Sequence, residues 1–256
     1  PLKGDHLAQL PKIKLDSTKQ IEVEQIATGV FSPLEGFMNE DDFHSVVEKL
    51  RLSNGVIWPL PIVLDVTAEE ADKFTIGEEI ALANSEGGIF ATLYLDAKYA
   101  FDREKTAGKI YGTHSDKHPG VKMMKTMHPI LLSGKINLIN WRRSPTMGYE
   151  LTPKQTRILF DEKGWIKVVG FHTRNIPHKG HEFILHSVLE DEYCDGLFIH
   201  PVVGKKKEGD FSQLYILKSY KKLIERGLLP DKAILAAFPT FSRYAGPREA
   251  VFTAIC

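Results

Sequence analysis

The second part of the chain, from residue 151 to residue 256, alternates short apolar segments with amphipathic ones, and this alternation restricts the possible folds most. The apolar segments predict three strands, at 165–171, 197–203 and 233–238. The segments between them predict helices, at 177–193 and 211–226. Because consecutive strands separated by helices are joined by right-handed crossovers, we predict a parallel α/β sheet.

Two more helices are predicted at the ends of this part. Thr152 caps a helix that starts at Pro153 and is stopped by Gly164, and another helix starts at Pro247. The sequence ends at Cys256 inside that last helix, after three predicted strands, whereas a typical sheet has about 5–6. We therefore expect the α/β domain to be truncated at its carboxyl end and the chain to be a fragment.

Residues 1–150 lack this alternation and are rich in strand-forming segments separated by short turns, so they predict a separate, mostly-β domain. Asn39 caps a helix that continues to Leu50, because apolar residues recur there at helical spacing. Strands are predicted at 56–66, 80–84, 89–94 and 136–141, the second and third forming a hairpin. The glycine-containing, polar segment 106–127 predicts a long loop. Together these elements predict a small barrel with an attached helix.

Charge and composition exclude several classes of protein. Lysine plus arginine and aspartate plus glutamate are both 33, and a dedicated nucleic-acid binder usually has a basic excess. Cys194 and Cys256 are too few for a disulfide framework or a cysteine-based zinc site. No apolar run is long enough to cross a membrane, and the first residues do not resemble a signal peptide. We expect a cytoplasmic protein with no nucleic-acid or membrane partner.

The segment from Val168 to Glu182 carries the strongest chemical signal. It predicts a buried strand, a basic turn and the start of a helix. A helix N-terminus has unpaired N–H groups and a partial positive charge, so it attracts phosphate. Arg174, His178, Lys179 and His181 surround that helix start, which predicts a polyphosphate site.

The three predicted parallel strands end in basic turns, and such ends meet at one edge of the sheet. The turns hold residues 172–175, 203–207 and 240–248. The lysine run Lys205–Lys207 is alternatively a solvated part of the surface. Arg248, together with Glu249, alternatively has a structural role at the surface. Their convergence on one edge nevertheless favours a site for a multiply charged anion.

Individual residues in these turns suggest specific roles. The planar guanidinium of Arg174 fits sulfate, phosphate or carboxylate. Asn175 is able to cap the following helix or to bind a ligand oxygen, and Gly180 leaves room for a nucleotide close to the backbone. We predict no protein metal site, because segment His114–His118 has no obvious further ligand. His186 and His200 are expected to be core or rim histidines.

Several separated segments resemble the ATP-sulfurylase family. In the first part they are Gly29–Met38, Arg51–Val66, Tyr111–Thr113 and His118–Lys122. In the second part they are the Thr-Arg-Asn and His-x-x-His signature and the segment Arg243–Ala250. The resemblance implies a PUA-like domain at 1–150 and a Rossmann-like nucleotidyltransferase domain at 151–256. It further implies the reaction of ATP and sulfate to adenosine 5′-phosphosulfate and pyrophosphate, or its reverse.

The resemblance also implies roles for the residues of the signature. Arg174 and His172 would hold sulfate, and Thr173 and Asn175 would surround the α-phosphate. His178 and His181 would stabilise the departing pyrophosphate, with Mg²⁺ bound to the ATP phosphates. We add Gly180 and Arg248 as substrate-binding residues, and we expect a homo-oligomer. The family generally has glutamine in place of His172, and its later Gly-Arg-Asp-His segment is absent here.

Two other functions stay open on the sequence. One is a different His-x-Gly-His nucleotidyltransferase that acts on an alcohol phosphate, although it does not predict the first domain. The other is RNA binding through the PUA-like domain, which the balanced charge disfavours.

Overall fold

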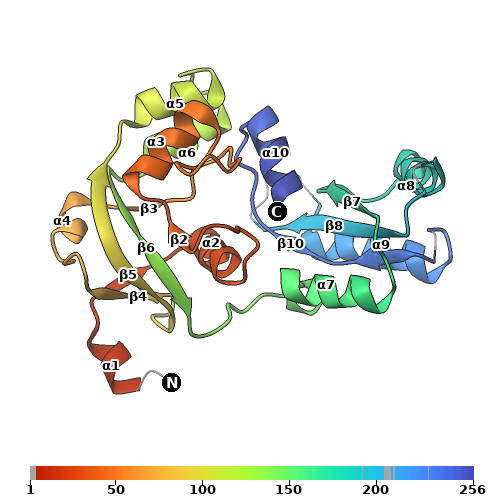
Figure 1. The fold of residues 1–256 in the computed structure, drawn as a ribbon, viewed down its shortest axis with the longest axis horizontal. Coiled ribbons are helices and arrows are strands. Elements are labelled where there is room, and N and C mark those ends of the chain that lie inside the picture. Colours follow the sequence, from red (N-terminus) through yellow and green to blue (C-terminus); the bar gives the residue numbers. More distant parts are fainter. Residues whose placement is uncertain (1–3, 192, 205–208, 210, 230) are drawn as a thin grey trace. The chain divides into compact units, whose positions relative to one another are not determined.

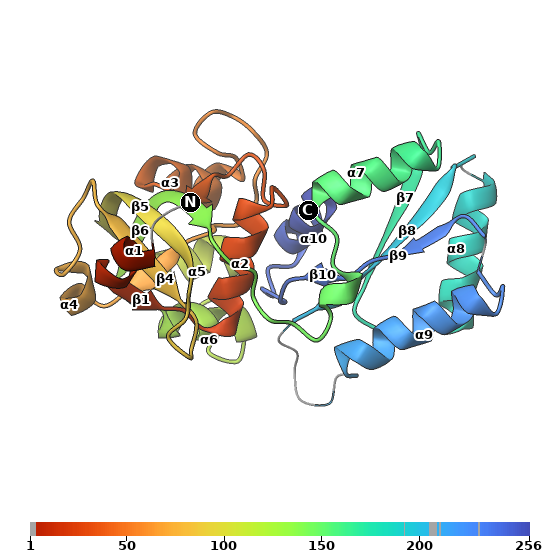
Figure 2. The same cartoon turned by 90° about the horizontal axis from the view of Figure 1, so that it is seen from below.

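The computed structural model describes residues 4–256 apart from residues 192, 205–208, 210 and 230. Its elements group into two compact units (Figures 1 and 2). The N-terminal unit holds the chain up to Arg142 and, after a long interruption, Ser242–Cys256. The second unit holds Arg143–Phe241. The final helix of the chain is therefore part of the first unit. None of the described helices is long and apolar enough to cross a membrane.

The N-terminal unit is built on a six-stranded mixed sheet in the order β1-β4-β5-β6-β2, in which β3 also pairs with β6. The strands are β1 (Lys12–Lys14), β2 (Gly36–Phe37), β3 (Leu64–Val66), β4 (Glu79–Ala83), β5 (Ile89–Ala100) and β6 (Ile130–Leu138). Strand β1 is parallel to β4, and the other pairs are antiparallel. The expected hairpin is confirmed, since β4 and β5 pair across the turn at Ser85–Gly88.

The same unit contains more helix than the sequence predicts. Its helices are α1 (Gly4–Gln9), α2 (Ser17–Ala27), α3 (Glu40–Lys49), α4 (Ala68–Ala71), α5 (Arg103–Tyr111), α6 (Pro119–Thr126) and α10 (Pro247–Ile255). Helix α3 is capped by Asn39, whose side chain accepts a hydrogen bond from the Asp42 N–H, as expected. The strand expected at 56–66 is shorter, because the paired strand covers Leu64–Val66 and Ile57 makes only an isolated bridge with Arg51.

The prediction of a long loop at 106–127 is wrong, because this segment lies largely in α5 and α6. Asp102 caps α5, and Pro119 stands at the first turn of α6, where its missing N–H costs nothing. Gly108 and Gly120 permit close packing here. A Cβ at Gly108 would lie 2.5 Å from the His114 ring, and one at Gly120 would lie 2.4 Å from the Tyr111 ring. Glycines that suggested a loop in fact make room for aromatic rings against helices.

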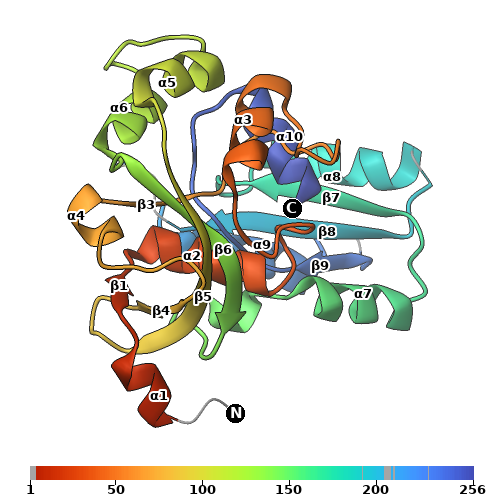
Figure 3. The ribbon, with the colours of Figure 1, turned by 60° about the vertical axis from the view of Figure 1, so that its left-hand side comes forward.

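Helix α2 lies against β6 at the centre of the N-terminal unit (Figure 3). Six consecutive residues, Ile21–Ile26, are buried, among them the carboxylates of Glu22 and Glu24. Buried charges need partners because water no longer solvates them. Glu22 pairs with Lys19 at 2.8 Å and with Arg243 at 2.9 Å, and Glu24 pairs with Arg142 at 2.6 Å.

The second unit has a parallel sheet in which β8 is central. Strand β7 (Val168–Thr173) pairs with one side of β8 (Gly196–Val203), and β9 (Ala233–Leu235) and β10 (Phe238–Pro239) pair with the other. The helices are α7 (Pro153–Glu162), α8 (Lys179–Asp191) and α9 (Gln213–Glu225), and a short 3₁₀ turn, η1, spans Met147–Tyr149. Parallel strands that alternate with helices confirm the predicted α/β fold class.

The alternation of side chains along β8 explains how the helices are distributed. Phe198 meets the Phe160 ring of α7 edge to face, at 5.5 Å between centroids. Leu197 and Ile199, which point the opposite way, share an apolar cluster with Leu185 of α8 and with residues of α9. Helix α7 therefore covers one face of the sheet, and α8 and α9 cover the other (Figure 2).

Candidate functional site

The parallel strands of the second unit end at one edge, as predicted for a ligand site. Strand β7 ends at Thr173, β8 at Val203 and β10 at Pro239. The turns after β8 and β10 are packed together, because a Cβ at Gly204 would lie 2.0 Å from the Thr240 carbonyl oxygen. The Thr240 N–H also donates to the Val203 carbonyl at 3.0 Å. The lysine run Lys205–Lys207 lies outside the described residues.

The turn after β7 is organised by Thr173. This side chain is only 8% exposed, and its hydroxyl accepts a hydrogen bond from the Asn175 N–H at 3.2 Å. A threonine that bonds the backbone two residues later shapes a tight turn. Arg174 and Asn175 are exposed beyond it. Because α8 begins at Lys179, Asn175 stands four residues before the helix and not at its capping position.

The two histidines of the signature form the start of α8. His178 Nδ1 accepts from the Gly180 N–H at 3.1 Å, and His181 Nδ1 accepts from the His178 N–H at 3.3 Å. Two N–H groups of the helix start are thereby satisfied by imidazoles. The rings are stacked, with 3.9 Å between centroids and 29° between planes. Since each Nδ1 accepts, each neutral ring carries its proton on Nε2 and offers one N–H donor.

The environment of His181 favours its neutral form. Burial lowers the pKa of His181, and the neighbouring His178 lowers it further. The Phe171 ring meets the His181 ring edge to face at 5.6 Å and restricts its orientation. Lys179 pairs with Glu182 at 3.0 Å on the same turn of the helix. The helix start therefore offers the Nε2–H groups of both rings as donors beside the helix dipole.

The opposite face of the same strand end carries an aromatic cluster that the sequence analysis missed. His172 is the register partner of His200, and their rings lie 6.4 Å apart. Phe238 lies 5.3 Å from His172 and stacks on His200 at 5.0 Å. Burial, followed by the neighbouring His172, lowers the pKa of His200 to about 4, and a hydrogen bond with the Ala237 backbone opposes both effects. Pairing the two predicted strands in parallel register is the signal that would have placed His200 beside His172.

Arg248 belongs to the N-terminal unit. Its guanidinium donates to four backbone carbonyl oxygens of that unit. The other predicted residues all lie in the second unit, within 172–181. His186, expected at the core or rim, bonds the Leu228 carbonyl through Nε2 at 3.1 Å.

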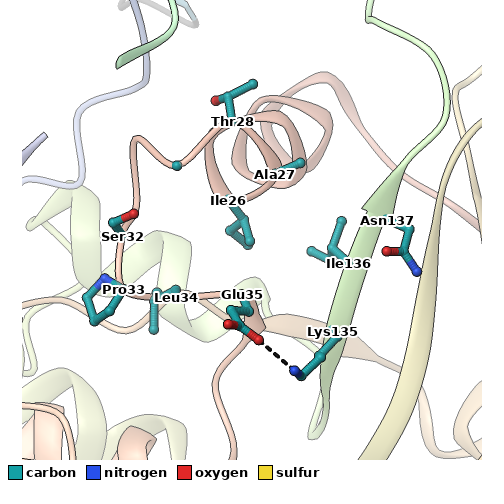
Figure 4. A pocket seen from close by; sticks show the side chains of 11 residues that line it. Ile26, Ala27, Thr28, Ser32, Pro33, Leu34, Glu35, Lys135, Ile136 and Asn137 are labelled. Atoms are coloured by element: carbon teal, nitrogen blue, oxygen red, sulfur yellow. Dashed lines mark ion pairs between the residues drawn. The ribbon is translucent and has the colours of Figure 1, made fainter. Parts of the chain in front are cut away.

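The described residues contain no cluster of three or more histidine, cysteine, aspartate or glutamate side chains suited to a metal ion. A cavity of about 610 Å³ lies elsewhere, in the N-terminal unit (Figure 4). Thr28, Ser32, Leu34 and Ile136 are among its lining residues, and the Glu35–Lys135 ion pair of 2.6 Å lies at its side. It includes no predicted site residue.

The fold defines a two-unit protein whose second unit is a parallel α/β domain, with the predicted site residues 172–181 in the turn and helix start after its first strand. Two family profiles match the chain: a PUA-like domain at residues 3–141 and ATP-sulfurylase at residues 147–256. Residues 147–256 belong to the ATP-sulfurylase family, and residues 3–141 belong to the PUA-like domain family.

Curated relatives and a solved structure agree with this assignment. The "Sulfate adenylyltransferase" of Halothermothrix orenii is 43% identical over 250 residues, which cover 97% of this chain and 65% of the relative. That of Pyrococcus abyssi is 43% identical over 247 residues, covering 96% and 64%. The chain of the "Hexameric APS kinase from Thiobacillus denitrificans" superposes with a TM-score of 0.77 and 25% identity, covering 98% of this chain and 46% of that one.

This chain therefore spans a little less than two thirds of the length of the curated relatives. The matches do not favour the two other functions that the sequence leaves open, RNA binding and a different His-x-Gly-His nucleotidyltransferase.

Proposed function

We propose that this chain carries out adenylyl transfer between ATP and sulfate, giving adenosine 5′-phosphosulfate and pyrophosphate, or the reverse. The observation that carries the proposal is the stacked pair His178 and His181 at the start of α8, directly after a parallel strand and a basic turn. The names of the curated relatives support the same reaction.

The reaction depends on alignment of the substrates and on stabilisation of negative charge more than on proton transfer. A sulfate oxygen attacks the α-phosphorus, the bond from that phosphorus to the oxygen bridging to the β-phosphorus breaks, and pyrophosphate leaves. Sulfate is already ionised, so no general base has to remove a proton. What the protein supplies is in-line alignment and donors for the developing charge.

The residues of the turn and the helix start divide this work. Arg174 and His172 hold sulfate, since a guanidinium fork matches two oxygens of a tetrahedral anion. Thr173 and Asn175 shape the turn around the α-phosphate. This division follows the family resemblance and is part of the proposal.

His178 and His181 direct their Nε2–H donors to the β- and γ-phosphates and stabilise the departing pyrophosphate. Gly180 permits close approach of the nucleotide to the backbone. It also leaves space for the neighbouring ring, because a Cβ there would lie 3.0 Å from His178 Cε1.

Mg²⁺ would bind the phosphate oxygens of ATP in this reaction. The described groups around the turn are N–H donors of imidazole, guanidinium and backbone, which suit anions, whereas Mg²⁺ takes oxygen ligands. When bound, the ion would neutralise part of the phosphate charge. We further propose a homo-oligomer, supported by the likeness to a hexameric protein, and a cytoplasmic location.

Sulfate-dependent exchange of labelled pyrophosphate into ATP tests the proposal. We expect exchange that requires both Mg²⁺ and sulfate, with adenosine 5′-phosphosulfate detected by anion-exchange chromatography. Parallel reactions without sulfate, and with an alcohol phosphate in its place, are the controls. Exchange that proceeds equally well without sulfate would show that the chain transfers the adenylyl group to another acceptor.

A further inference from the structure

The last helix of the chain, α10, is joined to the turn before it by one carboxylate. Glu249 Oε1 accepts from the Arg243 N–H at 2.7 Å, and its Oε2 accepts from the Ala245 N–H at 3.1 Å. A helix start that is bonded in this way cannot move independently of the preceding turn. Residues 243–246 and α10 therefore form one local structure.

An aromatic cluster holds α10 in the core of the N-terminal unit. Phe252 is fully buried and meets Phe31 edge to face at 5.3 Å and Trp58 at 5.7 Å. The Arg243 guanidinium lies 4.6 Å from the centre of the Phe252 ring and pairs with the buried carboxylate of Glu22. Burial of a large aromatic side chain among other rings strongly favours the packed position of the helix that carries it.

Arg248 gives α10 a polar anchor in the same unit. Its Nη2 donates to the carbonyls of Val47 at 2.9 Å and Lys109 at 3.1 Å. Its Nη1 donates to the carbonyls of Val46 at 3.2 Å and Pro59 at 3.3 Å. Both terminal nitrogens thus use their two N–H groups on backbone oxygens.

Three of these four oxygens lie at helix ends. Val46 and Val47 belong to the last turn of α3, and Lys109 belongs to the last turn of α5. Carbonyls in a last helical turn carry the negative end of the helix dipole. The Val46 carbonyl also accepts the Leu50 N–H at the end of α3, at 3.1 Å. A planar, permanently charged guanidinium reaches four carbonyls through two separate nitrogens, whereas an ammonium group has three N–H donors on a single nitrogen.

We propose that Arg248 is a positioning residue that anchors residues 242–256 to the N-terminal unit, and that it does not bind substrate. Segment 242–256 is then a structural part of the PUA-like unit, although the family profile assigns it to the domain that begins at residue 147. The turn Arg243–Gly246, which the sequence predicts to lie at the anion site, takes its position from α10 and Arg248. This proposal concerns folding contacts and goes beyond the proposed reaction.

Hydrogen exchange measured by mass spectrometry tests the anchor in the full chain. Arg248→Lys keeps the charge but loses the fork, and Phe252→Leu loosens the same helix through an apolar contact. We expect both variants to speed exchange of the amides in 247–256 by at least about tenfold. Arg103→Lys is the matched control, because Arg103 donates to the Met127 carbonyl at 2.8 Å in the same unit without touching α10. It should leave exchange in 247–256 unchanged.

Binding of adenosine 5′-phosphosulfate separates anchoring from substrate contact. We expect Arg248→Lys to weaken binding no more than Phe252→Leu does. Unchanged exchange in 247–256 in Arg248→Lys, or a tenfold larger loss of affinity than in Phe252→Leu, would overturn the proposal. If the parent chain does not bind this compound, the proposed function fails while the exchange measurement still decides the anchor. Arg248→Gln is measured alongside in case Arg248→Lys does not fold.

Discussion

Glu22 and Arg243 lie 221 positions apart in the sequence and form a buried ion pair of 2.9 Å between Oε1 and Nη2. Glu24, two residues further along α2, pairs with Arg142 at 2.6 Å. The chain leaves the N-terminal unit at Arg142 and returns to it just before Arg243. Both arginines are therefore bound by carboxylates of helix α2.

The paired imidazoles at the start of α8 should be needed for turnover. Replacing either one, in His178→Ala or His181→Ala, removes an N–H donor to the departing pyrophosphate, and we expect the rate of sulfate-dependent exchange to fall about 10²-fold or more. His186→Ala on the same helix is the control, because His186 bonds the Leu228 carbonyl away from the helix start. Equal rates for His178→Ala and His186→Ala would remove the proposed role.

The guanidinium of Arg174 should govern affinity for sulfate. Arg174→Lys keeps the charge and loses bidentate geometry, so we expect the apparent KM for sulfate to rise about tenfold, with a smaller change for ATP. Arg157→Lys on α7, where the side chain is exposed, controls for a general effect of replacing a guanidinium by an ammonium group. A KM for sulfate that does not change in Arg174→Lys would argue for a contact with another part of the substrates.

Stability should fall as the solution becomes acidic because His200 resists protonation. Its pKa is lowered from 6.5 to about 4 by burial first and by His172 second, so the unfolded chain binds the proton more readily than the folded one. The contribution is present above pH 6.5 and is lost as the pH falls toward 4. Between pH 7 and pH 5 the loss is on the order of 2 kcal/mol.

Urea unfolding at these two pH values measures this loss. His200→Gln should reduce the pH dependence, whereas His186→Gln should retain it. The same pH dependence in His200→Gln as in the parent would assign the effect to other groups.

Gly36 should tolerate no side chain, which explains one glycine of the first-domain resemblance. A Cβ at Gly36 would lie 1.7 Å from the Gly134 carbonyl oxygen on the paired strand β6. We expect Gly36→Ala to lower the free energy of unfolding of the N-terminal unit by at least about 2 kcal/mol. Gly148→Ala, where nothing lies within 4 Å of the added atom, serves as comparison and should change the free energy little. Equal stability of the two variants would show that β2 moves aside at low cost.

Local patterns in the sequence determined the parallel strands, the capped helix α3 and the strand–turn–helix that starts at Val168. Those features depend on side-chain period and on residues within a few positions of one another, so they are visible in one dimension. The sequence analysis did not predict helices α5 and α6, because their glycines suggested a loop. The structure shows that these glycines make room for the rings of His114 and Tyr111.

Only the tertiary structure decided what surrounds His172 and where Arg248 belongs. The partners of His172 come from β8 and β10, and those of Arg248 come from α3, α5 and Pro59, far away in the sequence. An arginine followed by a glutamate has the same sequence pattern whether it faces a ligand or a set of carbonyls. What decides between these two roles is that the chain returns to its first unit at Ser242. The local sequence pattern does not predict this return, because the return depends on burial against residues far away in the sequence.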